Sequence, residues 1–228
     1  MDLIKKYRME EAKPCSTPIE DGLKLSEDDD FKFVCPTLYR NLVGSLMYLT
    51  ATQPDITYGV ILISRFMEKP KKTYREAGKR ILRHVRGTDG DGLYYQNVND
   101  SKVLRYCDSD WDGSIDDSKN TSRNVFFVGS IAITWMLKKQ QVVALSMTKA
   151  EYISLSLASC QVLWIRWVLE DLKHDAKESP IIYCHSKLVV TLISWEGQAH
   201  KNQISFYPRL GEERKSGDSK LQVTRPNW

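Results

Sequence analysis

Residues 103–111 read Val-Leu-Arg-Tyr-Cys-Asp-Ser-Asp-Trp, so that a largely apolar run leads directly into two aspartates. Residues 103–107 predict a strand, because β-branched, aromatic and apolar side chains favour the extended backbone. Asp108 follows directly after this run. The stretch predicts a strand that delivers a carboxylate at its end. A solvated aspartate in a turn is the alternative.

The second half of the chain alternates between the two kinds of secondary structure. Further strands are expected at residues 93–95, 124–135, 142–146 and 181–184. A long helix is expected at residues 149–173 and a short one at 188–194. The long helix carries an apolar stripe with the spacing typical of helices packed on a core, made of Ile153, Leu157, Cys160, Trp164 and Val168. Together these elements predict an α/β fold.

The first half is predicted to be mainly helical after an extended connector, residues 1–36, that contains several prolines and an acidic run. Helices are expected at residues 39–50, 54–67 and 73–87. The third has a capping-box signature in Thr73 and Glu76 at its start and Gly87 at its end. The domain boundary is expected between residues 87 and 102.

Composition is that of an ordinary globular protein, with 42% hydrophobic and 27% charged residues in a chain of 228. No apolar run approaches the roughly 20 residues needed to span a bilayer, and the first residues lack a signal-peptide pattern. The five widely spaced cysteines contain no CxxC pair, so we expect reduced thiols and no zinc cluster. These features predict a cytoplasmic or nuclear protein that is not secreted.

Several strings, in this order, resemble those of copia-type LTR retrotransposon Pol polyproteins. They are Lys-Pro-Cys-Ser-Thr-Pro at 13–18, Tyr-Arg-Asn-Leu-Val-Gly-Ser-Leu-Met-Tyr-Leu at 39–49, Gln-Pro-Asp-Ile at 53–56, residues 77–88, Tyr-Cys-Asp-Ser-Asp-Trp at 106–111, Lys-Lys-Gln at 138–140, Ala-Glu-Tyr at 150–152 and Tyr-Cys at 183–184. Each string alone is weak, but their shared order indicates the family.

The resemblance implies an organisation. Residues 37–95 resemble a reverse-transcriptase thumb/connection segment, residues 102–197 an RNase H-like domain with a mixed sheet and flanking helices, and residues 198–228 form a poorly patterned tail. The family's polymerase motif, Y-x-D-D, does not occur. The resemblance therefore implies a Pol-derived fragment without a polymerase site.

The resemblance also implies a nuclease site that cleaves the RNA strand of RNA–DNA hybrids with two Mg²⁺ ions about 4 Å apart, or with Mn²⁺. Asp108 and Glu151 match two of the family's four catalytic and metal-binding acids. Glu151 has a competing interpretation, because Thr148 and Glu151 also form a capping-box signature. The third position, acidic in the family, is His185, and the fourth acid is missing from residues 201–204. The site is expected to be degenerate and any metal binding weak.

Basic residues predict contacts with nucleic acid. Arg75, Lys79, Arg83 and Arg86 share one face of the third helix, and Lys138, Lys139 and Gln140 lie between two expected strands. A solvated helix face is the alternative for the first group. No base readout is implied, so an RNA–DNA hybrid or other nucleic acid would be bound with little sequence preference. Another polymerase chain is a further expected partner, and a membrane is not.

Two alternatives to an impaired nuclease stay open. One is an active hybrid-cutting enzyme whose missing ligands come from Asp110, His185 or the tail. The other is a module that binds nucleic acid or a polymerase chain without catalysis. Whether His185 acts as a ligand distinguishes the active enzyme from an impaired one. Whether the basic helix binds nucleic acid without cleavage distinguishes the binding module.

Overall fold

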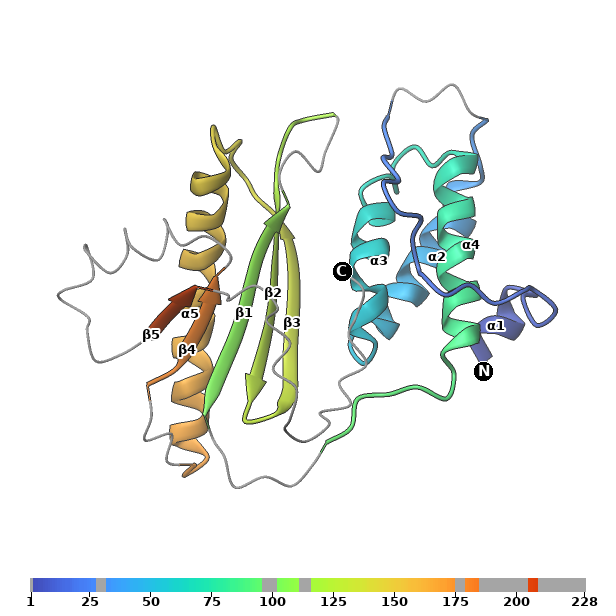
Figure 1. The fold of residues 1–228 in the computed structure, drawn as a ribbon. Coiled ribbons are helices and arrows are strands. Elements are labelled where there is room, and N and C mark those ends of the chain that lie inside the picture. Colours follow the sequence, from blue (N-terminus) through green and yellow to red (C-terminus); the bar gives the residue numbers. More distant parts are fainter. Residues whose placement is uncertain are drawn as a thin grey trace, which may run out of the picture. The chain divides into compact units, whose positions relative to one another are not determined.

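A computed structural model describes residues 2–27, 32–95, 102–110, 116–174, 179–184 and 205–208. The chain divides into two compact units, one formed mainly by Met1–Leu93 and one by Tyr94–Gly113 with Asp117–Lys220. The first unit is helical, and the second contains a sheet and one long helix (Figure 1).

The helices of the first unit are α1 (Asp2–Lys6), α2 (Pro36–Leu49), α3 (Thr57–Ser64), preceded by the 3-10 turn η1 (Pro54–Ile56), and α4 (Lys72–Gly87). The three expected helices are confirmed. Helix α2 begins at Pro36, earlier than expected, because proline fits the first helical turn. The expectation of a wholly extended connector is wrong at its start, where α1 forms.

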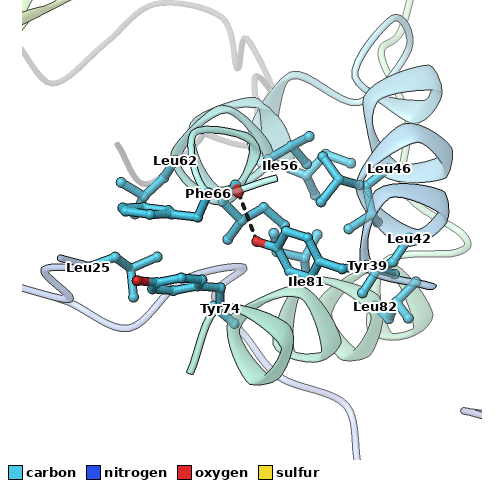
Figure 2. Close-up of a cluster of buried hydrophobic side chains, with 14 of the residues drawn as sticks. Leu25, Tyr39, Leu42, Leu46, Ile56, Leu62, Phe66, Tyr74, Ile81 and Leu82 are labelled. Carbon is cyan, nitrogen blue, oxygen red and sulfur yellow. Dashed lines mark hydrogen bonds between the residues drawn. The ribbon is translucent and has the colours of Figure 1, made fainter. Parts of the chain in front are cut away.

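The core of the first unit lies between α2, α3 and α4 (Figure 2). Tyr39 is 1% exposed, and its hydroxyl donates a hydrogen bond to the Ile63 carbonyl at 2.8 Å. Burial raises the pKa of Tyr39, so the hydroxyl stays protonated and remains a donor. Phe66 and Tyr74 stack with ring centroids 4.2 Å apart. The apolar positions of α2 and α4 thus form one continuous core.

Helix α4 begins without the expected capping box. It is preceded by Lys71, no side chain caps it, and Thr73 Oγ1 is buried without a hydrogen-bond partner among the described residues. The backbone of the preceding segment replaces the cap, because Lys72 N–H donates to the Lys32 carbonyl at 3.0 Å. A tertiary contact therefore replaces the local capping signal of Thr73 and Glu76.

After α4, residues 93–95 do not form the expected strand.

Within its described residues, the second unit contains a five-stranded sheet in the order β3-β2-β1-β4-β5. The strands are β1 (Val103–Asp110), β2 (Thr121–Val128), β3 (Ile131–Lys139), β4 (Ile181–Cys184) and β5 (Ser205–Pro208). Strand β2 is antiparallel to β1 and β3, whereas β4 is parallel to β1 and β5 is parallel to β4. Helix α5 (Met147–Asp171) connects β3 to β4 and packs on β1, β2 and β4 (Figure 1). The expected α/β class, a mixed sheet with a flanking helix, is confirmed.

Two expected strands of this unit need correction, and one strand was missed. Residues 124–135 form parts of two strands, because the chain turns at Gly129, whose φ of 58° suits glycine. Residues 142–146 are not a strand, and β5 was not expected. The expected helix at 188–194 lies outside the described residues.

The buried face of α5 differs from the apolar stripe expected in the sequence. The residues that pack toward the sheet are Ala150, Leu155, Ala158, Val162 and Ile165. Two members of the expected stripe, Leu157 and Trp164, are 37% and 55% exposed. Helix α5 is long and apolar enough to cross a membrane, but core helices of soluble proteins can have the same length and composition. The helix therefore has two apolar faces, of which one covers the sheet.

Candidate active site

A small hollow collects the two acidic residues that the sequence predicts. It is lined by Cys107 and Asp108 from β1, Glu151 and Ser154 from α5, and Cys184 from β4. Asp108 is half-buried, and its Oδ1 accepts a hydrogen bond from Ser109 N–H at 2.9 Å. The fold thus brings together two carboxyl groups from a strand and a helix that are far apart in the sequence.

Glu151 is buried, with 6% of its surface exposed. Helix α5 begins at Met147, and Ser146 caps it by accepting a hydrogen bond from Lys149 N–H at 3.2 Å. The expected capping box of Thr148 and Glu151 is therefore wrong, because the helix begins before Thr148 and Ser146 fills the capping position. Glu151 is therefore not part of a capping box, so this competing interpretation of its carboxylate is excluded.

A buried arginine ties α5 to the sheet. Arg105 is 0% exposed, and its Nη2 donates to Asn124 Oδ1 and to the Ser154 carbonyl. Ser154 Oγ in turn donates to the Asp108 carbonyl at 3.2 Å. Burial lowers the pKa of Arg105 to about 10, so the guanidinium remains charged at neutral pH. This network fixes the backbone of Asp108 and the helix that carries Glu151.

Two thiols complete the hollow. Cys107 and Cys184 are in-register neighbours on the parallel strands β1 and β4, and both are buried thiols that form no disulfide among the described residues. The hydrogen bond with Cys184, followed by burial, raises the pKa of Cys107 above its ordinary value. A thiol kept protonated is a poor metal ligand, and sulfur is in any case too soft for Mg²⁺.

Sequence reasoning missed Arg105, Asn124 and Ser154, which support the hollow. Alternation along β1 could have found the first of them, because Arg105 occupies an inward position between Val103 and Cys107. A charged residue on the inward side of a strand indicates a buried polar network. Asn124 and Ser154 carry no comparable signal.

The carboxylates on the described residues fall short of a two-metal site. Among those residues, no group of three or more His, Cys, Asp or Glu side chains is placed to hold a metal ion. Asp108 and Glu151 supply hard oxygen donors suited to one hydrated Mg²⁺, whereas two ions need more carboxylates. His185 directly follows Cys184 in the sequence, and it lies outside the described residues, as do residues 201–204 and the side chain of Asp110.

The basic residues of α4 have different surroundings. Arg75 and Lys79 both lie near Glu76 Oε1, at 3.6 and 3.2 Å, with 43% and 42% of their side-chain surface exposed. Arg83 is half-buried. The Nη1 of Arg86 donates to the Ala12 carbonyl, so this side chain holds the N-terminal segment. Arg75 and Lys79 remain the most available for a phosphate.

The three residues at the end of β3 also separate. Lys138 is exposed, and Lys139 Nζ lies 2.7 Å from Asp117 Oδ1. Gln140 is 3% exposed, and its Nε2 donates to Ser122 Oγ at 3.0 Å and to the Ala150 carbonyl at 2.8 Å. Gln140 therefore joins the sheet to α5, and we withdraw it from the predicted nucleic-acid contacts.

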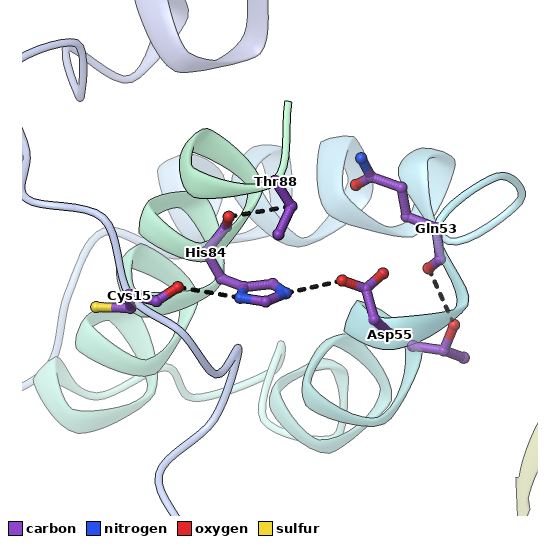
Figure 3. A network of polar contacts seen from close by, with 6 residues as sticks. Cys15, Gln53, Asp55, His84 and Thr88 are labelled. Carbon is purple, nitrogen blue, oxygen red and sulfur yellow. Dashed lines mark hydrogen bonds and ion pairs between the residues drawn. The ribbon is translucent and has the colours of Figure 1, made fainter. Parts of the chain in front are cut away.

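A second polar network lies in the first unit, around His84 (Figure 3). His84 Nε2 lies 2.7 Å from Asp55 Oδ2, and Nδ1 lies 3.1 Å from the Cys15 carbonyl. The hydrogen bond to Asp55 is the main cause that raises the pKa of His84, and burial opposes it. Because both ring nitrogens face acceptors, the arrangement favours the imidazolium, which donates at both positions. This network was not foreseen in the sequence.

Comparison with known proteins places the chain among transposon proteins. A retrovirus-related Pol polyprotein from transposon RE1 of Arabidopsis thaliana is 39% identical over 184 residues, which are 81% of this chain and 13% of that protein. A Pol polyprotein from transposon TNT 1-94 of Nicotiana tabacum is 38% identical over 202 residues, covering 83% of this chain and 15% of the relative. This chain thus spans only about a seventh of these relatives.

No protein-family profile matches the chain. A solved foamy viral protease–reverse transcriptase, in complex with double-stranded DNA, resembles it with a TM-score of 0.43 and 11% identity over 82% of this chain and 40% of that one. A likeness this distant carries no conclusion about function.

Proposed function

Because this chain belongs to the retrovirus-related Pol polyproteins of transposons, we propose that it is a Pol-derived region. In this proposal, its RNase H-like unit contacts RNA–DNA hybrids but cleaves them poorly or not at all. The observation that carries this proposal is the composition of the hollow. Asp108 and Glu151 share it with two thiols and a serine. His185 occupies the sequence position after β4 where the family resemblance calls for an acid.

The expected loss of activity follows from the electrostatics of phosphodiester cleavage. Removal of one preorganised charged group from an active site typically costs about 10²–10³ in rate. Asp108 and Glu151 would hold a single hydrated Mg²⁺ or Mn²⁺ weakly, and a second ion would have little to hold it. No hydrolytic step is therefore assigned to this hollow.

Contact with nucleic acid would come from exposed basic side chains in each unit. Lys138 is exposed at the end of the edge strand β3, and Arg75 and Lys79 are part-exposed on α4. Such residues neutralise backbone phosphates and read no bases, so binding would be salt-dependent and tolerant of sequence. These contacts fit a protein of the cytoplasm or nucleus.

The test combines binding and cleavage on one labelled RNA–DNA hybrid, with the full chain, in Mg²⁺ and then in Mn²⁺. We expect fluorescence anisotropy to report binding that weakens as salt rises, with the RNA strand left intact. Cleavage by the wild-type chain that Asp108→Asn abolishes would establish the active nuclease and overturn the proposal. Absence of binding at low salt would overturn the nucleic-acid contact.

A further inference from the structure

Helix α5 carries a second apolar face that no described part of the chain covers. Its members are spaced by four, three, four and three residues, and we call them the outer stripe: Ile153, Leu157, Cys160, Trp164 and Trp167. Leu157 is 37% exposed, Trp164 55% and Trp167 61%, and Cys160 is also exposed. This spacing is the heptad pattern of helices that pair along their length.

Two exposed tryptophans less than one turn apart are costly to leave in water. Tryptophan is enriched at the centres of protein interfaces, and contiguous exposed apolar patches mark binding surfaces. The buried face of α5 already packs on the sheet through Leu155, Val162 and Ile165. The outer stripe therefore offers a ready surface for a second helix.

We propose that the outer stripe docks against the outer stripe of a second copy of this chain, with the two α5 helices antiparallel around a twofold axis near Cys160. Helix α5 has 25 residues, Met147–Asp171, so Cys160 lies next to its midpoint. An antiparallel pair centred there places Leu157 opposite Trp164 of the second copy, and Ile153 opposite Trp167. Each bulky indole then faces a smaller aliphatic side chain, and the interface is self-complementary, as a twofold interface requires.

Charge favours this direction. Lys149 is exposed near the start of α5 and Asp171 is exposed at its end. In the antiparallel pair Lys149 lies opposite Asp171 of the second copy, at both ends of a contact about 33 Å long at about 1.5 Å per residue. A parallel pair would place like charges together at both ends and crowd tryptophan against tryptophan.

Sedimentation equilibrium of the full chain over a range of concentrations tests the association. We expect a monomer–dimer equilibrium whose dissociation constant rises at least about tenfold in Trp164→Glu. Tyr152→Glu is the matched control, because Tyr152 is 40% exposed on α5 outside the outer stripe and its change should leave the equilibrium unaltered. Circular dichroism verifies that both variants stay folded.

Disulfide mapping tests the direction of the pair and does not depend on a destabilising change. In a Cys160→Ser background, chains with Lys149→Cys are mixed with chains with Asp171→Cys and oxidised. The proposal predicts a 149–171 crosslink in the mixture and no 149–149 crosslink in the single variant. A 149–149 crosslink without a 149–171 crosslink would overturn the proposal. So would a monomer at all concentrations in sedimentation, or Trp164-dependent binding of the monomer to lipid vesicles.

Discussion

Asp108 at the end of β1 and Glu151 in α5 line the same hollow, and Glu151 is 6% exposed there. A buried carboxylate beside a second one is a site where a divalent cation could bind, but two donors hold a hydrated ion only weakly. We expect titration with Mn²⁺, followed by electron paramagnetic resonance, to detect at most one weakly bound ion per chain. Asp108→Asn should abolish it, and Glu170→Gln, on the exposed end of α5, should not. Two tightly bound ions would contradict this picture.

The stability of the first unit should depend on pH through His84. Its folded pKa is raised, chiefly by the hydrogen bond to Asp55. The stabilisation is therefore fully present below the unfolded pKa of about 6.5 and is lost as pH rises through the raised folded value. We expect His84→Gln to cost about 1–3 kcal/mol at pH 6 and less at higher pH. Urea unfolding followed by far-ultraviolet circular dichroism measures this, and an equal cost at all pH values would exclude an imidazolium at this position.

Arg105 should be essential to the fold of the second unit. Its replacement by alanine leaves Asn124 Oδ1 and the Ser154 carbonyl without this donor and opens a cavity in a fully buried site. We expect Arg105→Ala to lower the free energy of unfolding by about 3 kcal/mol or more. The control is Arg166→Ala on the surface of α5, where the pair with Glu170 at 2.9 Å should be worth about 0.5 kcal/mol or less. Tryptophan fluorescence in urea measures both, and similar losses would refute the structural role of Arg105.

Neighbouring residues at the end of β3 should respond in opposite ways. Gln140→Ala removes two buried hydrogen bonds and should cost about 1–3 kcal/mol of stability without changing hybrid affinity in the folded protein. Lys138→Ala should leave stability unchanged. It should reduce the slope of log affinity against log salt by about one, as expected for the loss of one phosphate contact. Thermal unfolding and anisotropy at several salt concentrations distinguish the two. A loss of affinity in folded Gln140→Ala would return this residue to the interface.

The sequence predicted the elements whose patterns are strictly local. Three helices of the first unit, β4 and the helix that became α5 follow from apolar spacing and from proline and glycine positions. It failed where a single residue changes the chain direction, as at Gly129, which divides one expected strand into two. It also failed at the start of α4, where the backbone of residue 32 replaces the side-chain cap.

The candidate site was only partly accessible from sequence. Asp108 and Glu151 could be singled out because they stand in recognisable strings, and the structure shows that they share a hollow. The polar support around them depends on which strand neighbours which. Arg105 meets Asn124 and Ser154 only because β2 and α5 both pack against β1. The orientation of α5 was misjudged because the helix is apolar on two faces.

The most direct test is a gain-of-function measurement at His185, the third of the acid positions in the family resemblance. We would compare RNA–DNA hybrid cleavage by the wild-type chain and by His185→Asp, with His185→Asp/Asp108→Asn as the control for the hollow. We expect the wild type to be inert, His185→Asp to cleave in Mg²⁺ or Mn²⁺, and the control to leave the hybrid intact. Equal cleavage by the wild type and His185→Asp would contradict this expectation, because the hollow would then be complete without an acid at position 185.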